Sequence, residues 1–321
     1  MRSPIPALAL VAAAALALSA CSGSSSPAPS EDTDGLTPIT VGVMPIVDVA
    51  AIYVGVEQGF FEEEGLDVSL ELAQGGAAIV PAVVSGDYQF GFSNVTSLLL
   101  GVSNGVPIQA VSAANFTTGS DPDIGAVVVP EGSPITTAAD LAGKTVAVNT
   151  LNNIGDSTVR NVVEKDGGDP AKIQFTEMGF PDMPAAIASE QVDAAWILAP
   201  HLTRAVAEGA RVISWNYAET DPDLMISAYF TSTPYAAEHP EIVESFTSAM
   251  RKSLEYADAN PDVTRATLDS YTEIDPEIKE TMTLPRFKPD INTESVQLLA
   301  DLALRYGMVD EAIDVSQLLP R

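Results

Sequence analysis

Between residues 39 and 72, the spacing of hydrophobic positions changes from a pattern typical of a strand to one typical of a helix and back again. Residues 39–43 form a short β-branched run, residues 49–56 form an apolar run of helical length, and apolar residues then alternate over 68–72. This order predicts a strand, a helix and a second strand. A unit of about 30 residues with that order implies a right-handed crossover and neighbouring parallel strands. The loop after Val43 then lies at the carboxyl edge of the sheet, where small ligands bind in such folds.

The alternation of strands and helices continues along the chain. Helical runs over 77–84 and 95–102 alternate with predicted strands over 89–92 and 108–113. Helices are expected to begin near Asp156, Asp182 and Pro200, between strands at 126–129, 145–148, 173–175, 194–197 and 212–214. Sustained alternation of this kind predicts an α/β fold.

Two breaks in the pattern predict two lobes. Glycine and an Asp-Pro-Asp turn interrupt residues 117–124, and a second crossing is expected at 225–231. We therefore predict a hinge of two crossing segments. The first lobe takes residues 37–123 and 232–321, and the second lobe takes residues 124–231.

The N-terminal residues 1–21 have the features of a secretory signal. Arg2 precedes an apolar run over 5–17 that is too short to span a bilayer. The sequence Leu-Ser-Ala-Cys that ends at Cys21 resembles the bacterial lipoprotein cleavage box, in which the cysteine is acylated. Residues 22–36 are rich in Ser, Pro and acidic residues, which predicts a flexible tether. We expect an extracytoplasmic protein that a lipid at Cys21 anchors to the cell membrane.

Composition narrows the functional classes. The chain has 15 basic and 44 acidic residues, a net charge of −29, which disfavours binding to nucleic acid or to an anionic membrane surface. Cys21 is its one cysteine, and its two histidines, His201 and His239, have no clustered metal ligands around them in the sequence. Gly143-Lys144-Thr145 is not a phosphate loop, because Ala138 stands where the first glycine is required. We expect a monomer without catalytic residues, cofactor or metal.

Several short motifs resemble one family of binding proteins. Tyr53, Gly-Phe-Phe at 59–61 and Gly-Leu-Asp-Val at 65–68 match its signature, and the similarity continues through 143–148 and 307–308. The chain resembles the NMT1/THI5-like and SsuA-like periplasmic binding proteins. This resemblance implies a two-lobed type II periplasmic binding protein fold, a small-molecule solute held between the lobes, and delivery to the permease subunits of an ABC importer. A ligand-sensing module without transport is the alternative.

Candidate solute contacts are polar or aromatic residues near the ends of strands and the crossing segments. Asp48 can cap the helix that follows it, accept a hydrogen bond from the solute, or do both. The turn over 149–158 follows a strand and opens a helix, so its backbone N–H groups can either bind acceptor atoms or be capped. Packing in the core is the alternative for the aromatic residues. The candidates are Asp48, Ser93, Asn94, Asn115, Phe116, Asn149, Asn152, Gly155, Asp156, Ser157, Trp196, His201 and Tyr229.

The expected cleft loops also indicate a solute class. A compact oxyanion would favour Arg or Lys. No basic residue occurs in the loops at 45–48, 75–76, 93–94, 115–116 and 149–158. Aromatic candidates such as Trp196, together with amide candidates such as Asn94, suit a flat nitrogen heteroaromatic such as a thiamine-precursor-like pyrimidine. A sulfonate- or nitrate-type anion is the alternative, because a site built from backbone N–H groups leaves little trace in sequence.

Overall fold

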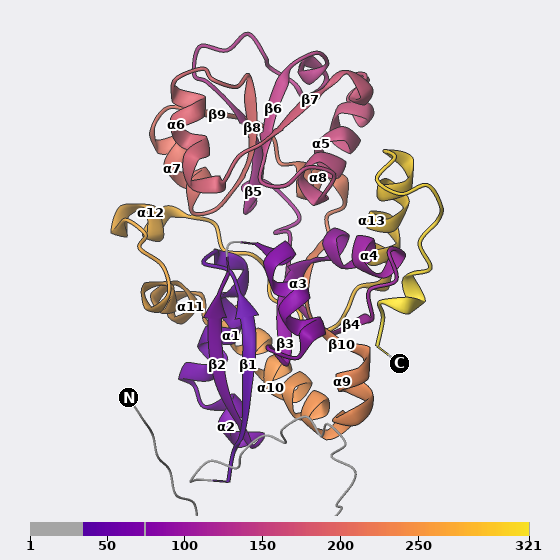
Figure 1. Ribbon diagram of the computed structural model, residues 1–321. Helices are drawn as coiled ribbons and strands as arrows, with labels where there is room; N and C mark the ends of the chain where they lie inside the picture. The colour runs from indigo at the N-terminus through magenta and orange to yellow at the C-terminus, as the bar shows by residue number, and fades with distance from the viewer. Residues whose placement is uncertain (1–34, 74, 321) are drawn as a thin grey trace, which may run out of the picture.

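The computed structural model describes residues 35–73 and 75–320, which form two sheets with helices packed around them (Figure 1). The predicted signal segment, Cys21 and the tether up to residue 34 lie outside the described residues. No helix within the described part of the chain is long and apolar enough to cross a membrane.

The first sheet has five strands in the order β2-β1-β3-β10-β4. Its strands are β1 (Thr37–Val43), β2 (Leu66–Leu72), β3 (Phe90–Asn94), β4 (Ile108–Phe116) and β10 (Met225–Ser232). β1 pairs in parallel with both β2 and β3. The parallel strand-helix-strand unit expected from residues 39–72 is therefore confirmed.

The second sheet has five strands in the order β7-β6-β8-β5-β9. Its strands are β5 (Gly125–Val129), β6 (Thr145–Val148), β7 (Gln174–Glu177), β8 (Ala194–Leu198) and β9 (Arg211–Ser214). β6 is parallel to β7 and β8, whereas β5 is antiparallel to β8 and β9. Both sheets are therefore mixed, and all five strands predicted for this lobe are present.

β10 corrects the predicted boundary between the lobes. Residues 225–231 were expected to be a return crossing within the second lobe. β10 instead pairs antiparallel with β3 and β4 inside the first sheet. All its residues are buried, and a strand that is buried on both faces has no polar alternation to indicate its partners. The return crossing therefore precedes Met225, and the other lobe boundaries stay predictions.

Helices connect the strands of each sheet. Those within the first part of the chain are α1 (Ala50–Glu57), α2 (Phe60–Glu63), α3 (Gly76–Ser85) and α4 (Val95–Ser103). Around the second sheet lie α5 (Ile154–Lys165), α6 (Met183–Ala188), α7 (His201–Ala207) and α8 (Asn216–Thr220). α6 and α7 lie on one side of this sheet, and α5 and α8 lie on the other (Figure 1).

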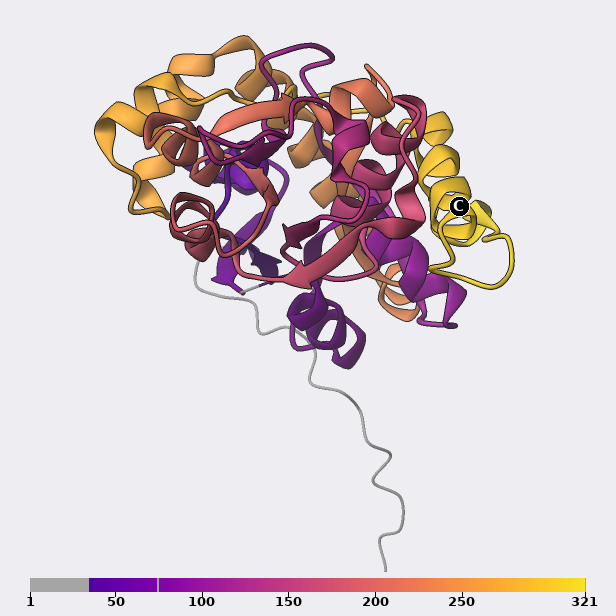
Figure 2. The same ribbon diagram turned by 90° about the horizontal axis from the view of Figure 1, so that it is seen from above.

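The C-terminal part of the chain is helical. Its helices are α9 (Thr233–Glu238), α10 (Pro240–Ala259), α11 (Pro261–Thr267), α12 (Pro276–Thr281) and α13 (Thr293–Arg305). α10 packs on α1, and its Phe246 stacks on Phe90 of β3 with 3.9 Å between ring centroids. α13 contacts α4 and α5. Figures 1 and 2 show α11 and α12 on one side of the molecule and α13 on the opposite side.

Candidate binding site

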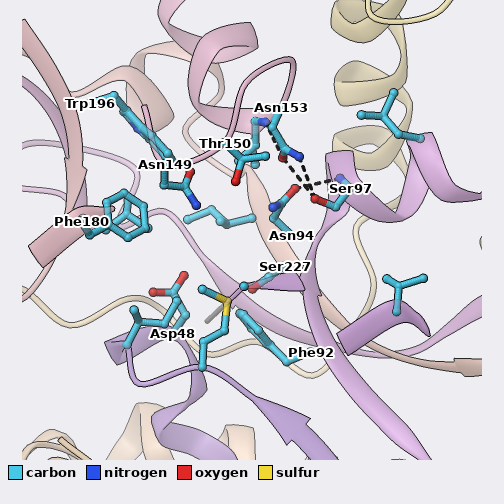
Figure 3. Close-up of a pocket in the computed structure, with 18 of the residues that line it drawn as sticks. Asp48, Phe92, Asn94, Ser97, Asn149, Thr150, Asn153, Phe180, Trp196 and Ser227 are labelled. Carbon is cyan, nitrogen blue, oxygen red and sulfur yellow. Dashed lines mark hydrogen bonds between the residues drawn. The ribbon is translucent and has the colours of Figure 1, made fainter. Parts of the chain in front are cut away.

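A cavity of about 340 Å³ lies between the two sheets, within the usual size range of ligand pockets. The first lobe contributes Asp48, Phe92, Asn94, Ser97 and Ser227 to its walls. The second lobe contributes Asn149, Thr150, Asn153, Phe180 and Trp196 (Figure 3). A small molecule in this cavity would therefore contact both lobes.

Asp48 is the charged residue of the cavity wall. It lies in a 3-10 turn between β1 and α1, and only 2% of it is exposed. Its Oδ1 accepts a hydrogen bond from Asn115 Nδ2 at 2.9 Å, while its Oδ2 has no partner. Burial raises the pKa of Asp48 to about 6, although the hydrogen bond from Asn115 acts in the opposite direction. The side chain makes no capping bond to α1, so Asp48 does not cap this helix.

Asn115 holds the Asp48 carboxylate from behind the cavity. It lies on β4, within a strand that continues three residues beyond the predicted end at 113. Its Oδ1 accepts a hydrogen bond from the hydroxyl of Ser227 on β10, and Ser227 lines the cavity. Asn115, which was predicted to contact the solute, is fully buried and instead orients the residue that faces the cavity.

The start of α5 forms part of the opposite wall. Asn153 is the N-cap of this helix and forms a capping box with Asp156. Asp156 accepts hydrogen bonds from the backbone N–H groups of Asn152 at 2.8 Å and Asn153 at 2.5 Å. Its burial raises its pKa, against the opposing effect of these hydrogen bonds. Asp156 therefore caps α5, and Asn149, Thr150 and Asn153 line the cavity in its place.

Two hydrogen bonds join the lobes beside the cavity. Asn153 Nδ2 donates to Ser97 Oγ at 2.9 Å, and Ser97 Oγ is 3.2 Å from Asn153 Oδ1 (Figure 3). Asn94 accepts a hydrogen bond from the backbone of Ser97 at 2.9 Å and so caps α4. Asn94 thus caps α4 and also lines the cavity, and its contact with the solute stays a prediction.

Trp196 on β8 forms an aromatic wall and is only 1% exposed. It packs edge-to-face against Phe180 at 5.6 Å and Tyr217 at 5.8 Å between ring centroids. Gly155 lies against it so closely that an added Cβ would be 2.4 Å from Trp196 Cε3. Gly155 therefore provides room for the indole, whereas its close approach was expected to serve the solute. The indole Nε1 has no hydrogen-bond partner.

Asp48, Asn94, Asn149 and Trp196 are the predicted contacts that line this cavity. His201 lies instead in a second cavity of about 790 Å³, with Arg204 and Glu208. The predicted residues that are absent from both linings are Ser93, Asn115, Phe116, Asn152, Gly155, Asp156, Ser157 and Tyr229.

Local packing explains where three of these residues lie. Phe116 lies under the ammonium group of Lys288, which is 5.3 Å from its ring centroid. Tyr229 packs edge-to-face on Phe92 at 5.8 Å, and the Ser157 hydroxyl donates to the carbonyl of Ile154 at 3.2 Å. Tyr229 thus packs against a residue of the cavity wall, and contact between these three residues and the solute stays a prediction.

The strand period identifies one wall residue that sequence reasoning missed. Phe92 and Asn94 are two positions apart on β3, so their side chains point to the same face, and both line the cavity. Ser93 between them points to the other face. The other polar or aromatic lining residues that were missed are Ser97, Thr150, Asn153, Phe180, Tyr217 and Ser227. Among the described residues, no group of three His, Cys, Asp or Glu side chains is arranged to hold a metal ion.

Known binding proteins resemble this chain in sequence. The sequence profile described as NMT1/THI5 like matches residues 46–264. The taurine-binding periplasmic protein of Escherichia coli K12 is 26% identical over 210 residues, which cover 64% of this chain and 62% of that protein. The formylaminopyrimidine-binding protein of Halalkalibacterium halodurans is 24% identical over 220 residues, which cover 66% and 63%. The chain thus spans less than two thirds of the length of these relatives.

Solved structures resemble the chain in fold. The alkanesulfonate-binding protein SsuA from Xanthomonas axonopodis pv. citri superposes with a TM-score of 0.74 at 18% identity, over 88% of this chain and 98% of that one. This likeness confirms the predicted two-lobed type II periplasmic binding protein fold, here with two mixed sheets of five strands. Because the family profile matches more than half of the sequence, this chain belongs to the NMT1/THI5-like family of non-catalytic solute-binding proteins.

Proposed function

We propose that this protein captures a small organic solute between its two lobes, outside the cytoplasm, and passes it to the permease subunits of an ABC importer. The observation that carries this proposal is the cavity of about 340 Å³ whose walls come from both sheets. Solute bound there would favour closure of the lobes. The lipid anchor at Cys21 would keep the protein, as a monomer, close to its permease.

The proposed solute is a nitrogen heteroaromatic, because the charge of the cavity disfavours an anion. Within the described residues, the lining of this cavity contains no Lys, Arg or His, and Asp48 is its charged side chain. Two like unit charges 5 Å apart repel by about 3 kcal/mol at an effective dielectric constant of about 20. A compact oxyanion would therefore be repelled by an ionised Asp48 without a compensating cation in the wall.

Aromatic rings and amides in the walls support the same solute class. The rings of Phe92, Phe180, Trp196 and Tyr217 line the cavity, and an aromatic pair adds about 0.5–1.5 kcal/mol beyond the burial of its area. The side chain of Asn149 and those of other lining amides supply both donors and acceptors. A flat polar ring can use both features, whereas a sulfonate can use mainly the donors.

A sulfonate- or nitrate-type anion is the second candidate. Two relatives are named for taurine and alkanesulfonate, and Ser97, Thr150 and the asparagines of the wall can donate hydrogen bonds to an oxyanion. A zwitterion such as taurine would also offer an ammonium group to Asp48. This alternative keeps the transport function and changes only the solute.

Thermal unfolding in the presence of candidate solutes tests the solute class. Pyrimidines and flavins should raise the melting temperature of the purified protein and change its tryptophan fluorescence. Stabilisation by taurine or an alkanesulfonate, with none by any pyrimidine or flavin, would contradict the heteroaromatic solute and favour the anion. The proposal that the protein captures a solute would still stand.

A gene deletion tests transport separately from binding. If the protein serves an importer, deletion should abolish uptake of the solute that stabilises it, and Cys21→Ala should release the protein from the membrane fraction. Unchanged uptake after deletion would favour the alternative of a ligand-sensing module without transport.

A further inference from the structure

Two buried polar atoms of residues that line the cavity lack hydrogen-bond partners. Seven buried side-chain atoms in the described residues have no partner. Of these atoms, Asp48 Oδ2 and Trp196 Nε1 belong to residues that line the cavity between the lobes. Leaving a buried donor or acceptor unpaired costs free energy. A molecule that pairs both atoms would remove that cost.

The two atoms have opposite hydrogen-bonding character and lie on opposite lobes. A carboxylate oxygen accepts hydrogen bonds, whereas the indole N–H only donates. Asp48 follows β1 of the first sheet, and Trp196 lies on β8 of the second (Figure 3). A solute that pairs with both atoms must therefore present a donor to the first lobe and an acceptor to the second.

The free oxygen of Asp48 is held in a fixed orientation. Asn115 donates to Oδ1 at 2.9 Å, and the Ser227 hydroxyl donates to Asn115 Oδ1 in turn. This chain spans β4 and β10, two neighbouring strands of the first sheet. Oδ2 is thus the carboxylate oxygen of Asp48 that is left without a hydrogen-bond donor.

The groups around Asp48 leave its negative charge uncompensated. Asp123 raises the pKa of Asp48, and Asp48 in turn raises the pKa values of Tyr217, Tyr229 and Tyr271, so all these neighbours are acidic groups. Burial raises the pKa of Asp48 to about 6. A solute nitrogen that donates to Oδ2 would supply the positive partial charge that these side chains do not.

We infer that the solute is an amino-substituted nitrogen heterocycle. Its amino group donates to Asp48 Oδ2, and its ring nitrogen or carbonyl oxygen accepts from Trp196 Nε1. The inference rests on the proposed function and makes these two residues specificity determinants on opposite lobes. The cavity should therefore distinguish an amino group from an oxo group at the same ring position, because that exchange replaces a donor by an acceptor.

Matched pairs of heterocycles test this discrimination. Suitable probes are cytosine with uracil, adenine with hypoxanthine, and 4-aminopyrimidine with 4-pyrimidinone, each titrated calorimetrically against the full-length protein. The amino member of at least one pair should bind about ten- to hundred-fold more tightly than its oxo partner, the range of a hydrogen bond to a charged group.

Asp48→Asn should reverse the preference. The asparagine can keep its Oδ1 bonded to Asn115 and present its N–H₂ where Oδ2 stands now. The variant should then bind the oxo member of a pair more tightly than the amino member. Asp156→Asn is the matched control, because Asp156 is also 2% exposed but caps α5 away from the cavity lining. It should leave the preference unchanged.

Trp196→Phe removes the indole donor and keeps an aromatic ring. Affinity for the amino probe should fall roughly three- to ten-fold, as expected for one neutral hydrogen bond, and the preference for the amino group should remain. Trp215→Phe is the control, since Trp215 does not line the cavity. It also leaves Trp196 as the one tryptophan of the chain, so its fluorescence then reports on the cavity alone. Melting curves of each variant without solute check that it is folded.

The outcomes separate this inference from the proposed function. If a heterocycle binds wild type but Asp48→Asn and Trp196→Phe retain wild-type affinity and preference, the inference is wrong and the heteroaromatic solute stands. If taurine or an alkanesulfonate binds and no heterocycle does, both are wrong and solute capture stands. Binding of no amino-heterocycle overturns the inference whatever else binds.

Discussion

The guanidinium of Arg286 donates a hydrogen bond to the carbonyl of Pro222 at 2.7 Å. Its Nε also donates to the carbonyl of Thr117 at 2.6 Å. Thr117 and Pro222 lie on the two segments that connect the lobes, and Arg286 forms a β-bridge with Phe116 beside them. A segment of the C-terminal part of the chain thus holds both connections together, where sequence predicted only two crossing segments.

Arg286→Ala should lower stability by about 1–3 kcal/mol, because it leaves two carbonyls of the hinge without their donor. Urea unfolding measures this loss. Arg251→Ala is the control, since Arg251 pairs with Asp290 at 2.7 Å on the surface, where both side chains are largely exposed. Such a pair contributes about 0–1 kcal/mol. Equal losses in the two variants would show that the Arg286 contacts do not stabilise the hinge.

Gly155→Ala should destabilise the second lobe. The new Cβ would lie 2.4 Å from Trp196 Cε3, so the indole must shift, and overpacking of this kind costs about 1–3 kcal/mol. Tryptophan fluorescence should change together with the melting temperature. Gly132→Ala is the matched control because no atom lies within 4 Å of its added Cβ. A melting temperature for Gly155→Ala as high as that of Gly132→Ala would contradict the packing described for Trp196.

The sequence located the sheets well because their strands are short apolar runs between clear breaks. β6 matches its predicted bounds of 145–148, and Asp48 lies at the cavity because it follows β1 at the carboxyl edge of the sheet. β10 could not be assigned, because its pairing with β3 and β4 depends on residues more than 100 positions away. Ser227 on this strand was missed for the same reason.

Two residues show why the candidate site was only partly predictable. Asp156 was proposed as a solute contact, yet Asn153 and Asp156 form a capping box, a local pattern of an N-cap residue followed three positions later by an acidic one. That signal was available in the sequence. Phe180 follows no strand end or motif, and it reaches the cavity because of its packing against Trp196. Contacts of this kind depend on the fold as a whole.

Asn115→Ala should raise the pKa of Asp48, because the hydrogen bond from Asn115 lowers it. The pH range over which Asp48 influences stability should then extend to higher pH. Unfolding at a series of pH values measures the shift. Asn161→Ala is the control, since Asn161 is also buried and its amide donates to Thr220 at 3.1 Å, away from Asp48. It should lower stability by a similar amount at every pH. A pH profile unchanged in shape for Asn115→Ala would contradict the role given to Asn115.

Asp48→Asn should stabilise the solute-free protein at neutral pH. Burial raises the pKa of Asp48 from its ordinary value of 3.8 to about 6 in the folded state. The folded protein therefore binds a proton at the Asp48 carboxylate more tightly than the unfolded chain does. This proton binding contributes to the free energy of unfolding; the contribution is fully present below pH 4 and is lost as the pH rises through about 6. A shift of that size corresponds to about 3 kcal/mol.

The asparagine variant has no such group, so its stability should lack this dependence on pH. Denaturant unfolding at pH 4, 6 and 8 should show wild type and Asp48→Asn close together at pH 4 and the variant more stable at pH 8. Saturating solute should reverse the order at pH 8, because the carboxylate then gains its hydrogen-bond donor and the amide does not. Equal stability of the solute-free wild type and the variant at pH 8 would contradict this prediction. It would mean that the buried, ionised Asp48 does not destabilise the folded protein.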